Sequence, residues 1–310
     1  MIIFSTHFGL MNKQPNLDFI DVKLDDDNEL FIAPRLIEQS ANPLIKPMAD
    51  AVYKFFAHLI MAVRQDDKSK LSKLLSGIHE PKETRLGYGM FNSNGKSSGP
   101  KLKNDLIDAI WSNPLVRDEK LHNFGDFAFF VRNFSCDRHS DITTKIIELF
   151  LIEFTQKQCA KLGKPMKGGI AKEVLNPTTL EWEHVIVQLP VFNDDFIDQP
   201  IILVPKSIVW KKGAFNSNLN CFYRFARNYI IEIKDTTFLD GVLRNGKDDT
   251  ILVKDFDALN PDKKEALLQW VSKYQELPND FWLQPKGVLT SLSDAEISEI
   301  VHGNRRQSAA

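Results

Sequence analysis

The 310-residue sequence has only three cysteines, Cys136, Cys159 and Cys221, and they are spread along the chain without regular spacing. So sparse and odd a set excludes a disulfide framework and indicates a reducing compartment. The opening residues, MIIFSTHFGLMNKQ, lack a basic region followed by an apolar run, so no signal peptide is expected. The most apolar stretch, 142–154, contains charged residues and is far shorter than a membrane span. We therefore expect a cytoplasmic protein without a membrane partner.

Signatures of zinc sites and of serine hydrolases are also missing. Cys136 and His139 have Cys-x-x-His spacing, but no second pair has comparable spacing, and the chain contains no Gly-x-Ser-x-Gly elbow. A strong net charge is lacking too, and the formal value of −2 argues neither for nor against nucleic acid. What the chain does have is ordinary globular composition, with 43% hydrophobic residues and 22 Phe to build a core.

The apolar periodicity predicts a mixed α/β protein (α+β), with a mixed sheet flanked by helices and a long buried central helix. That helix is predicted to begin near Asp141, which would cap it or pair with Lys145, and to end at Gly163. We expect a single large domain over 1–302, with a soft division near 164–180, and a disordered tail at 303–310. The predicted buried strands are 127–134, 185–189 and 201–204; the predicted helices are 48–63, 71–75 (stopped by Gly77), 101–112, 218–229, 261–274 and a short one capped by Ser293 and Glu296.

The strongest candidate for chemistry is the junction SCDRHSD, which follows the predicted strand 127–134 and precedes the central helix. Ligands of α/β folds gather where strands give way to helices. Asp137 and Asp141 could bind Mg²⁺ or Mn²⁺ through carboxylate oxygens, and Arg138 could hold a substrate phosphate. The alternative is structural, with Asp141 serving only the helix terminus.

Two later segments could complete such a site with a lysine. In IILVPK, an apolar strand ends at Lys206, and in YIIEIK an apolar run carries Glu232 and Lys234. The second pattern is similar to the strand of PD-(D/E)XK nucleases, in which carboxylates bind the metal and a lysine stabilises charge. The alternative for each is an ordinary half-exposed strand.

Basic residues gather in two acid-free stretches, 154–172 and 199–231, which could form one positive face or two separate solvated surfaces. Within 210–229 the basic residues alternate with aromatic ones, a composition that suits stacking and phosphate contact. Helical phasing turns the aromatic residues inward and the arginines outward. The candidate substrate-binding residues are Lys211, Lys212, Arg224 and Arg227.

The glycine-rich loop 86–100 contains GMFNSNGKS, which resembles a phosphate-binding P-loop. It has five residues between the glycines where the Walker pattern has four, and Pro100 interrupts the join to the next helix. Residues 87–97 could therefore bind a nucleotide or form a surface or lid loop.

The segments LGYG with GK and GP (86–100), DRHSDITTKII (137–147) and IILVPKSIV (201–209) together resemble a family of uncharacterised bacterial proteins. That family has an Asp-Arg-x-Ser-Asp-x-Thr-Thr run and a later Leu-x-Pro-Lys strand, and the resemblance covers roughly residues 80–230. It implies a bacterial or mobile-element protein in a phage-defence setting, without supplying a reaction. His139 stands where the family run leads us to expect Ile.

Three functions follow as hypotheses. The first is a metal-dependent nuclease or phosphodiesterase-like component that acts on DNA or RNA in a bacterial defence system. In that hypothesis Asp137 and Asp141 hold the metal, and Lys206, or Glu232 with Lys234, completes the site. The second is a non-catalytic subunit of a defence complex that recognises nucleic acid or a protein partner through its basic faces. The third is a nucleotide-binding regulator that uses the glycine-rich loop.

Overall fold

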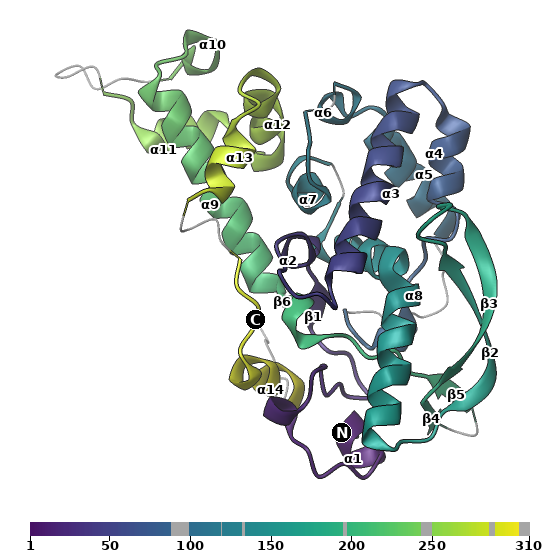
Figure 1. Cartoon of the computed structure of the whole chain (residues 1–310). Helices are drawn as coiled ribbons and strands as arrows, with labels where there is room; N and C mark the ends of the chain where they lie inside the picture. Colours follow the sequence, from purple (N-terminus) through teal and green to yellow (C-terminus); the bar gives the residue numbers. More distant parts are fainter. Residues whose placement is uncertain are drawn as a thin grey trace.

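The computed structural model describes residues 1–87, 99–118, 120–131, 134–194, 197–242, 250–284 and 289–303. It confirms the α+β class: small sheets are flanked by helices, one of which is long and central (Figure 1). Within the described ranges the strands form three two-stranded antiparallel sheets in place of one mixed sheet. The pairs are β1 (Leu30–Ile32) with β6 (Val209–Lys211), β2 (Lys167–Leu175) with β3 (Trp182–Leu189), and β4 (Val191–Asp194) with β5 (Ile197–Pro200).

The central helix is α8, which runs from Cys136 to Leu162 and is buried along most of its first half. It ends at Gly163 in a left-handed conformation (φ 62°), as predicted. It begins about one turn earlier than predicted, because the Ser135 side chain accepts the Arg138 N–H and caps the helix. Asp141 therefore lies inside the helix, on the same face as Asp137 one turn before it.

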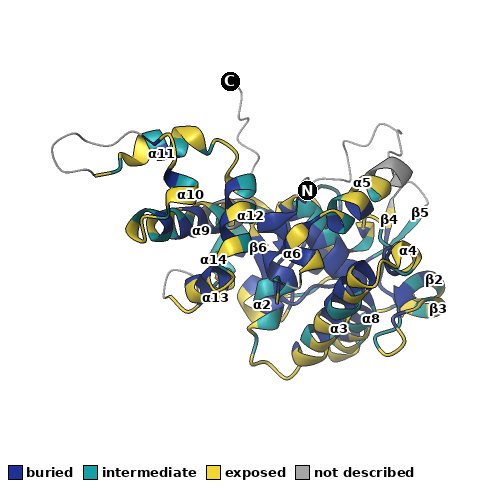
Figure 2. Ribbon diagram, turned by 90° about the horizontal axis from the view of Figure 1, so that it is seen from above, coloured by how far each residue is buried: buried dark blue, intermediate teal, exposed yellow. Residues whose placement is uncertain are grey.

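Further helices cover α8, and the burial colouring in Figure 2 shows a continuous interior beneath them. The predicted helix 48–63 is confirmed within α3, with Pro47 in its first turn. The predicted stop at Gly77 is wrong, because α4 already ends at Leu74. Gly77 instead lies under the Trp182 ring, which a Cβ atom would approach to 2.3 Å. Of these helices, α2 (Pro34–Glu38) and α3 (Lys46–Arg64) contact α8 directly. The helices α4 (Lys68–Leu74) and α6 (Pro114–Arg117) pack on α3, and α5 (Gly99–Trp111) packs on α4 and α6.

Two of the three predicted strands are wrong. Residues 127–134 contain the short helix α7 (Phe127–Phe130), whose rings pack into an aromatic cluster that overrides their β propensity. The segment 201–204 is buried but belongs to no sheet. Its first three N–H groups donate in turn to Pro190 O, Glu83 O and the Thr155 hydroxyl, which are not parts of one neighbouring strand. The predicted strand 185–189 is confirmed within β3.

After β6 the chain forms a group of helices that extends away from the core along α9 (Figure 1). The predicted helices 218–229 and 261–274 are confirmed within α9 and α12, and the Ser293–Glu296 capping box closes the start of α14. YIIEIK, proposed as a nuclease strand, is the end of α9 instead. The bounds are α9 Lys212–Glu232, α10 Thr236–Leu239, α11 Val253–Leu259, α12 Lys263–Lys273, α13 Leu277–Trp282 and α14 Asp294–His302.

Buried polar groups fasten these C-terminal helices to the core. The Trp282 indole N–H donates to Asp126 Oδ1 at 2.7 Å, and the Arg35 guanidinium lies 4.5 Å from the centre of the Trp282 ring. Glu38 lies beside them and accepts the Gly125 N–H. Burial, together with the negative charge of Asp126, raises the pKa of Glu38 to about 7. A titratable cluster thus attaches α13 to the core.

Among the described helices, none combines the length and the apolar composition that crossing a bilayer requires.

Candidate functional site

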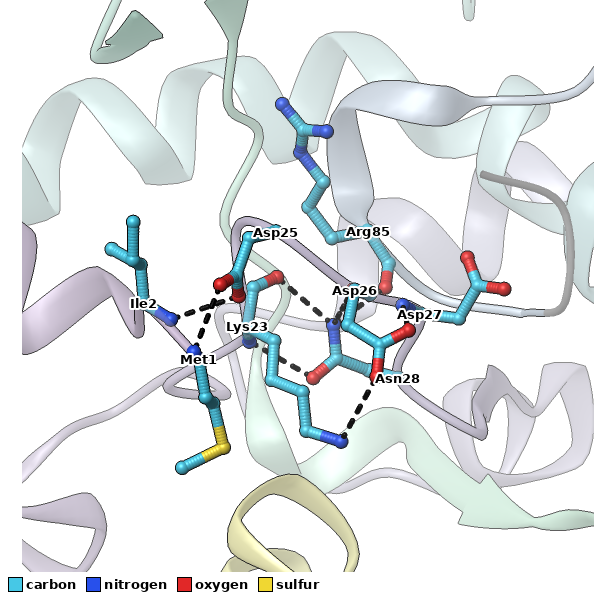
Figure 3. Close-up of polar contacts among 8 residues, drawn as sticks. All are labelled: Met1, Ile2, Lys23, Asp25, Asp26, Asp27, Asn28 and Arg85. Atoms are coloured by element: carbon cyan, nitrogen blue, oxygen red, sulfur yellow. Dashed lines mark hydrogen bonds and ion pairs between the residues drawn. The ribbon is translucent and has the colours of Figure 1, made fainter. Parts of the chain in front are cut away.

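Asn28 positions the chain segment that faces the start of α8 (Figure 3). Its side-chain oxygen accepts the Lys23 N–H at 2.9 Å, while its amide group donates to the carbonyls of Lys23 and Arg85. Gly87 follows, with φ +99°, and a Cβ atom there would lie 2.8 Å from Asp137 Oδ1. The backbone at Gly87 therefore runs directly against the first acidic side chain of the predicted site.

Asp137 and Asp141 interact electrostatically, as their spacing predicts. Burial raises the pKa of Asp141 to about 8, with further contributions from the negative charges of Asp137 and Glu80, while Arg138 opposes the shift. At neutral pH the Asp141 carboxyl is therefore mostly protonated. The acid pair and Arg138 come together as predicted, and Glu80 joins them from the loop before α5.

The residues chosen to complete a nuclease centre do not join this acid pair. Lys206 Nζ forms an ion pair with Asp294 Oδ1 at 2.8 Å, beside α14. Glu232 and Lys234 lie at the far end of α9, which Figure 1 shows projecting away from the start of α8. Over the described ranges, no three His, Cys, Asp or Glu side chains converge closely enough to hold a metal ion. The structure therefore does not bring the five predicted catalytic residues together at one place.

The core instead contains a buried charge network that the sequence did not reveal. Lys145 pairs with Glu148 on α8, and both side chains are only 1% exposed. Glu148 also pairs with Lys172 on β2, and Lys172 pairs in turn with Glu83. Lys145 thus faces Glu148, not Asp141 as the helix-pair alternative required. The network ties the β2–β3 hairpin to α8, and its buried position favours a structural role.

His139, the unexpected residue of the family-like run, points into the core. Its ring packs against Phe124 and Phe134, and its Nε2 lies 3.0 Å from the Phe124 carbonyl oxygen. Burial lowers the pKa of His139 to about 3, so the ring is neutral and donates to that carbonyl. His139 therefore takes no part in the polar cluster around Asp137.

A cavity lined by several charged side chains lies between α9, α11 and α12. It has a volume of about 540 Å³, within the range of small-ligand sites. We call it the cationic pocket, and its lining residues are Asn220, Cys221, Tyr223, Arg224, Arg227, Asp257 and Lys263.

Three cations and one carboxylate make up the charge of this pocket. Arg224 is exposed, and its guanidinium lies 3.3 Å from the Cys221 sulfur, with no carboxylate partner among the described residues. Lys263 Nζ donates to the Asn220 side chain at 2.6 Å and lies over the Tyr223 ring. Arg227 pairs with Asp257 at 2.9 Å. The pocket therefore has net positive charge and donors that point at a shared space.

Other predicted basic residues do not contribute to this pocket. Lys211 pairs with Glu296 at 2.9 Å, and the side chain of Lys212 lies outside the described residues. In the stretch 154–172 the lysines at 157, 161, 167 and 172 are paired with carboxylates, so no continuous positive face joins the two stretches. The glycine-rich loop hypothesis falls mainly on residues 88–98, which are outside the described residues.

Sequence reasoning found Arg224 and Arg227 but missed the other charged members of the pocket. Lys263 and Asp257 come from α12 and α11, more than 25 residues later in the chain. The only available signal was the Asn260-Pro261 helix start, which places Lys263 in the first turn of a helix but does not say what that turn faces.

Comparison with known proteins gives a family but no activity. A family model described as a domain of unknown function (DUF8370) matches residues 9–216. No curated protein and no solved structure matches the chain. The acid pair lies within the matched segment, whereas the residues that line the cationic pocket begin at Asn220, just beyond it.

Proposed function

The chain belongs to the DUF8370 family of domains of unknown function, and we propose that it recognises nucleic acid by binding phosphate groups in the cationic pocket, without cleaving them. The observation that carries the proposal is the convergence of Arg224, Arg227 and Lys263 on one cavity. Guanidinium groups bind phosphate oxygens through paired hydrogen bonds, and a nearby ammonium adds charge. The lining residues come from three helices, α9, α11 and α12.

The pairing pattern of the three cations favours an external anion. Arg224 is exposed and lacks a carboxylate partner among the described residues, so it is available to a phosphate. Among the described residues, the Lys263 ammonium contacts two neutral groups, the Asn220 side chain and the Tyr223 ring. Since most other lysines of the two basic stretches are neutralised by ion pairs, attraction for a polyanion is concentrated at this pocket.

Fluorescence anisotropy with a labelled single-stranded 20-mer tests the proposal. Arg224→Gln should weaken binding about tenfold and reduce the slope of log K against log salt by about 0.7, the value of one phosphate contact. Arg117→Gln is the matched control, because it removes the same charge from an exposed arginine of α6 outside the pocket. Equal effects of the two substitutions, or affinity that does not depend on salt, would overturn the proposal.

A second candidate function is metal-dependent phosphodiester cleavage at the acid pair. It is favoured by the repulsion between Asp137 and Asp141, which a divalent cation would relieve. Mg²⁺ commonly binds through one or two carboxylates and several waters, so these two side chains would suffice as protein ligands. Cleavage of DNA or RNA with Mg²⁺ or Mn²⁺ that is lost in Asp137→Ala and Asp141→Ala would support this function. Cleavage that persists in both variants would exclude this site.

A further inference from the structure

We infer that the cationic pocket selects RNA over DNA, because Asp257 offers a carboxylate that accepts the ribose 2′-hydroxyl next to the bound phosphate. This inference rests on the proposed function and adds the class of nucleic acid to it. It starts from a feature that phosphate binding alone does not explain, namely a carboxylate inside a pocket whose other charges are positive.

Asp257 is held in a fixed position at the wall of the pocket. Its Oδ1 accepts the Tyr223 hydroxyl at 3.0 Å, and its Oδ2 accepts an Arg227 N–H at 2.9 Å. The Tyr223 side chain is buried, and that of Arg227 is largely so, which restricts both donors and therefore the orientation of the carboxylate.

The Asp257 carboxylate keeps the capacity to bind a ligand. A carboxylate has about four acceptor positions, and two hydrogen bonds leave about half of them open. The Asp257 side chain is 40% exposed and lines the pocket, so the open positions are accessible from the cavity. A hydroxyl or N–H donor on a ligand could therefore bind beside Arg227 without displacing an existing partner.

The charge of Asp257 indicates what such a ligand must carry. Next to a phosphate, the Asp257 carboxylate would lower affinity by repulsion, unless the ligand also brings a donor for its open acceptor positions. The donor that every ribonucleotide carries near its phosphate is the 2′-hydroxyl, which DNA lacks. A carboxylate also accepts the ribose 2′-hydroxyl in dinucleotide-binding proteins. Arg224 and Lys263 would then hold the phosphate while Asp257 identifies the sugar.

Three uridine 20-mers of equal charge test this inference: oligo-rU, oligo-dU and the 2′-O-methyl form of oligo-rU, which keeps an RNA-like sugar but has no 2′ donor. Anisotropy titrations of the wild-type chain should give about tenfold tighter binding of oligo-rU than of either other oligomer, the effect of one hydrogen bond to a charged group. Equal affinity for oligo-rU and the 2′-O-methyl form would overturn the inference.

Asp257→Asn provides a second test, because the amide keeps the shape of the side chain and removes its charge. Its affinity for oligo-dU should rise and its preference for oligo-rU should shrink, because an amide oxygen is a weaker acceptor than a carboxylate; an unchanged preference would overturn the inference. Should all three oligomers bind equally, with Arg224→Gln still weakening each, the inference fails and the proposed function survives. Should none bind, both fail. The wild-type comparison stands even if Asp257→Asn does not fold.

Discussion

Glu38→Gln is expected to remove a specific pH dependence from the stability of the protein. The pKa of Glu38 rises from an ordinary value of 4.5 to about 7 because the carboxyl is buried and lies near Asp126. Between these two values the folded chain retains a proton that the unfolded chain has released. The free energy of unfolding therefore falls as the pH rises through this window, and it stays lower above pH 7.

The size of the effect follows from the two pKa values. The difference between pKa values of 4.5 and about 7 is 2.5, and each pKa unit corresponds to about 1.4 kcal/mol. The free energy of unfolding should therefore fall by about 3 kcal/mol as Glu38 ionises. The Glu38 side chain is only 16% exposed, so solvent screens this cost weakly. The amide introduced by Glu38→Gln cannot ionise, and its oxygen can still accept the Gly125 N–H that Glu38 accepts.

Urea unfolding of both proteins between pH 4.5 and 7.5, followed by far-UV circular dichroism, measures this effect. The stability of Glu38→Gln relative to wild type should rise by about 3 kcal/mol across the window. Glu296→Gln is a suitable control, because the capping N–H of Ser293 and an ion pair with Lys211 lower the pKa of Glu296 to about 2, below the window. If the stability difference between Glu38→Gln and wild type does not change with pH, Glu38 is not buried next to the negative charge of Asp126, and the prediction is refuted.

Three further substitutions test other parts of the structure, each by urea unfolding. Lys145→Met should lower the free energy of unfolding by about 3–5 kcal/mol, because Glu148 would be left buried with Lys172 as its remaining partner. The double variant with Glu148→Leu should recover most of this lost stability. A loss below about 1 kcal/mol in the single variant would contradict the prediction. The stability of Asp141→Asn relative to wild type should rise by at least about 1 kcal/mol from pH 4 to pH 8, because only the wild-type carboxyl must ionise in a buried position. A stability difference that does not change with pH would contradict this prediction. Gly163→Ala should cost about 1 kcal/mol at the left-handed end of α8, and a neutral result would contradict that conformation.

Local patterns in the sequence predicted the elements whose structure depends on residues that are close together in the chain. The central helix was found because its apolar residues continue for several turns and Gly163 closes it. The proximity of Asp137 and Asp141 was also predictable, because residues four apart share a helix face. The exposed position of Arg224 on α9 followed from the same periodicity, whereas Arg227, which was predicted to face outward too, is only 12% exposed and pairs with Asp257.

The remaining features depend on contacts between distant segments. The aromatic residues of 127–134 favour a strand by propensity, but they pack on all sides in a cluster that includes Phe222 from α9. Lys206 could not be assigned, since its partner Asp294 is 88 residues away. The contribution of Asp257 to the cationic pocket likewise depends on how α11 packs beside α9, which no local pattern encodes.

The two charged regions of the protein differ in what they can do chemically. Around Asp137 the carboxylates repel one another and Asp141 is mostly protonated, so this region needs a cation before it can act on a phosphate. The cationic pocket already presents the charge that a phosphate requires. Because the two regions lie on opposite sides of the family boundary at residue 216, variants can test each one separately.

Alkylation of Cys221 measures most directly whether nucleic acid occupies the cationic pocket. Cys221 lines the pocket and is partly exposed, whereas the other two cysteines, Cys136 and Cys159, are buried, so labelling of the folded protein reports on the pocket. Oligo-rU at about ten times its Kd should slow the alkylation of Cys221 by about tenfold, and the same RNA concentration should slow it only about twofold in Arg224→Gln, whose affinity is about tenfold lower. An alkylation rate that stays unchanged while anisotropy shows the RNA to be bound would place the RNA elsewhere and contradict the proposed function.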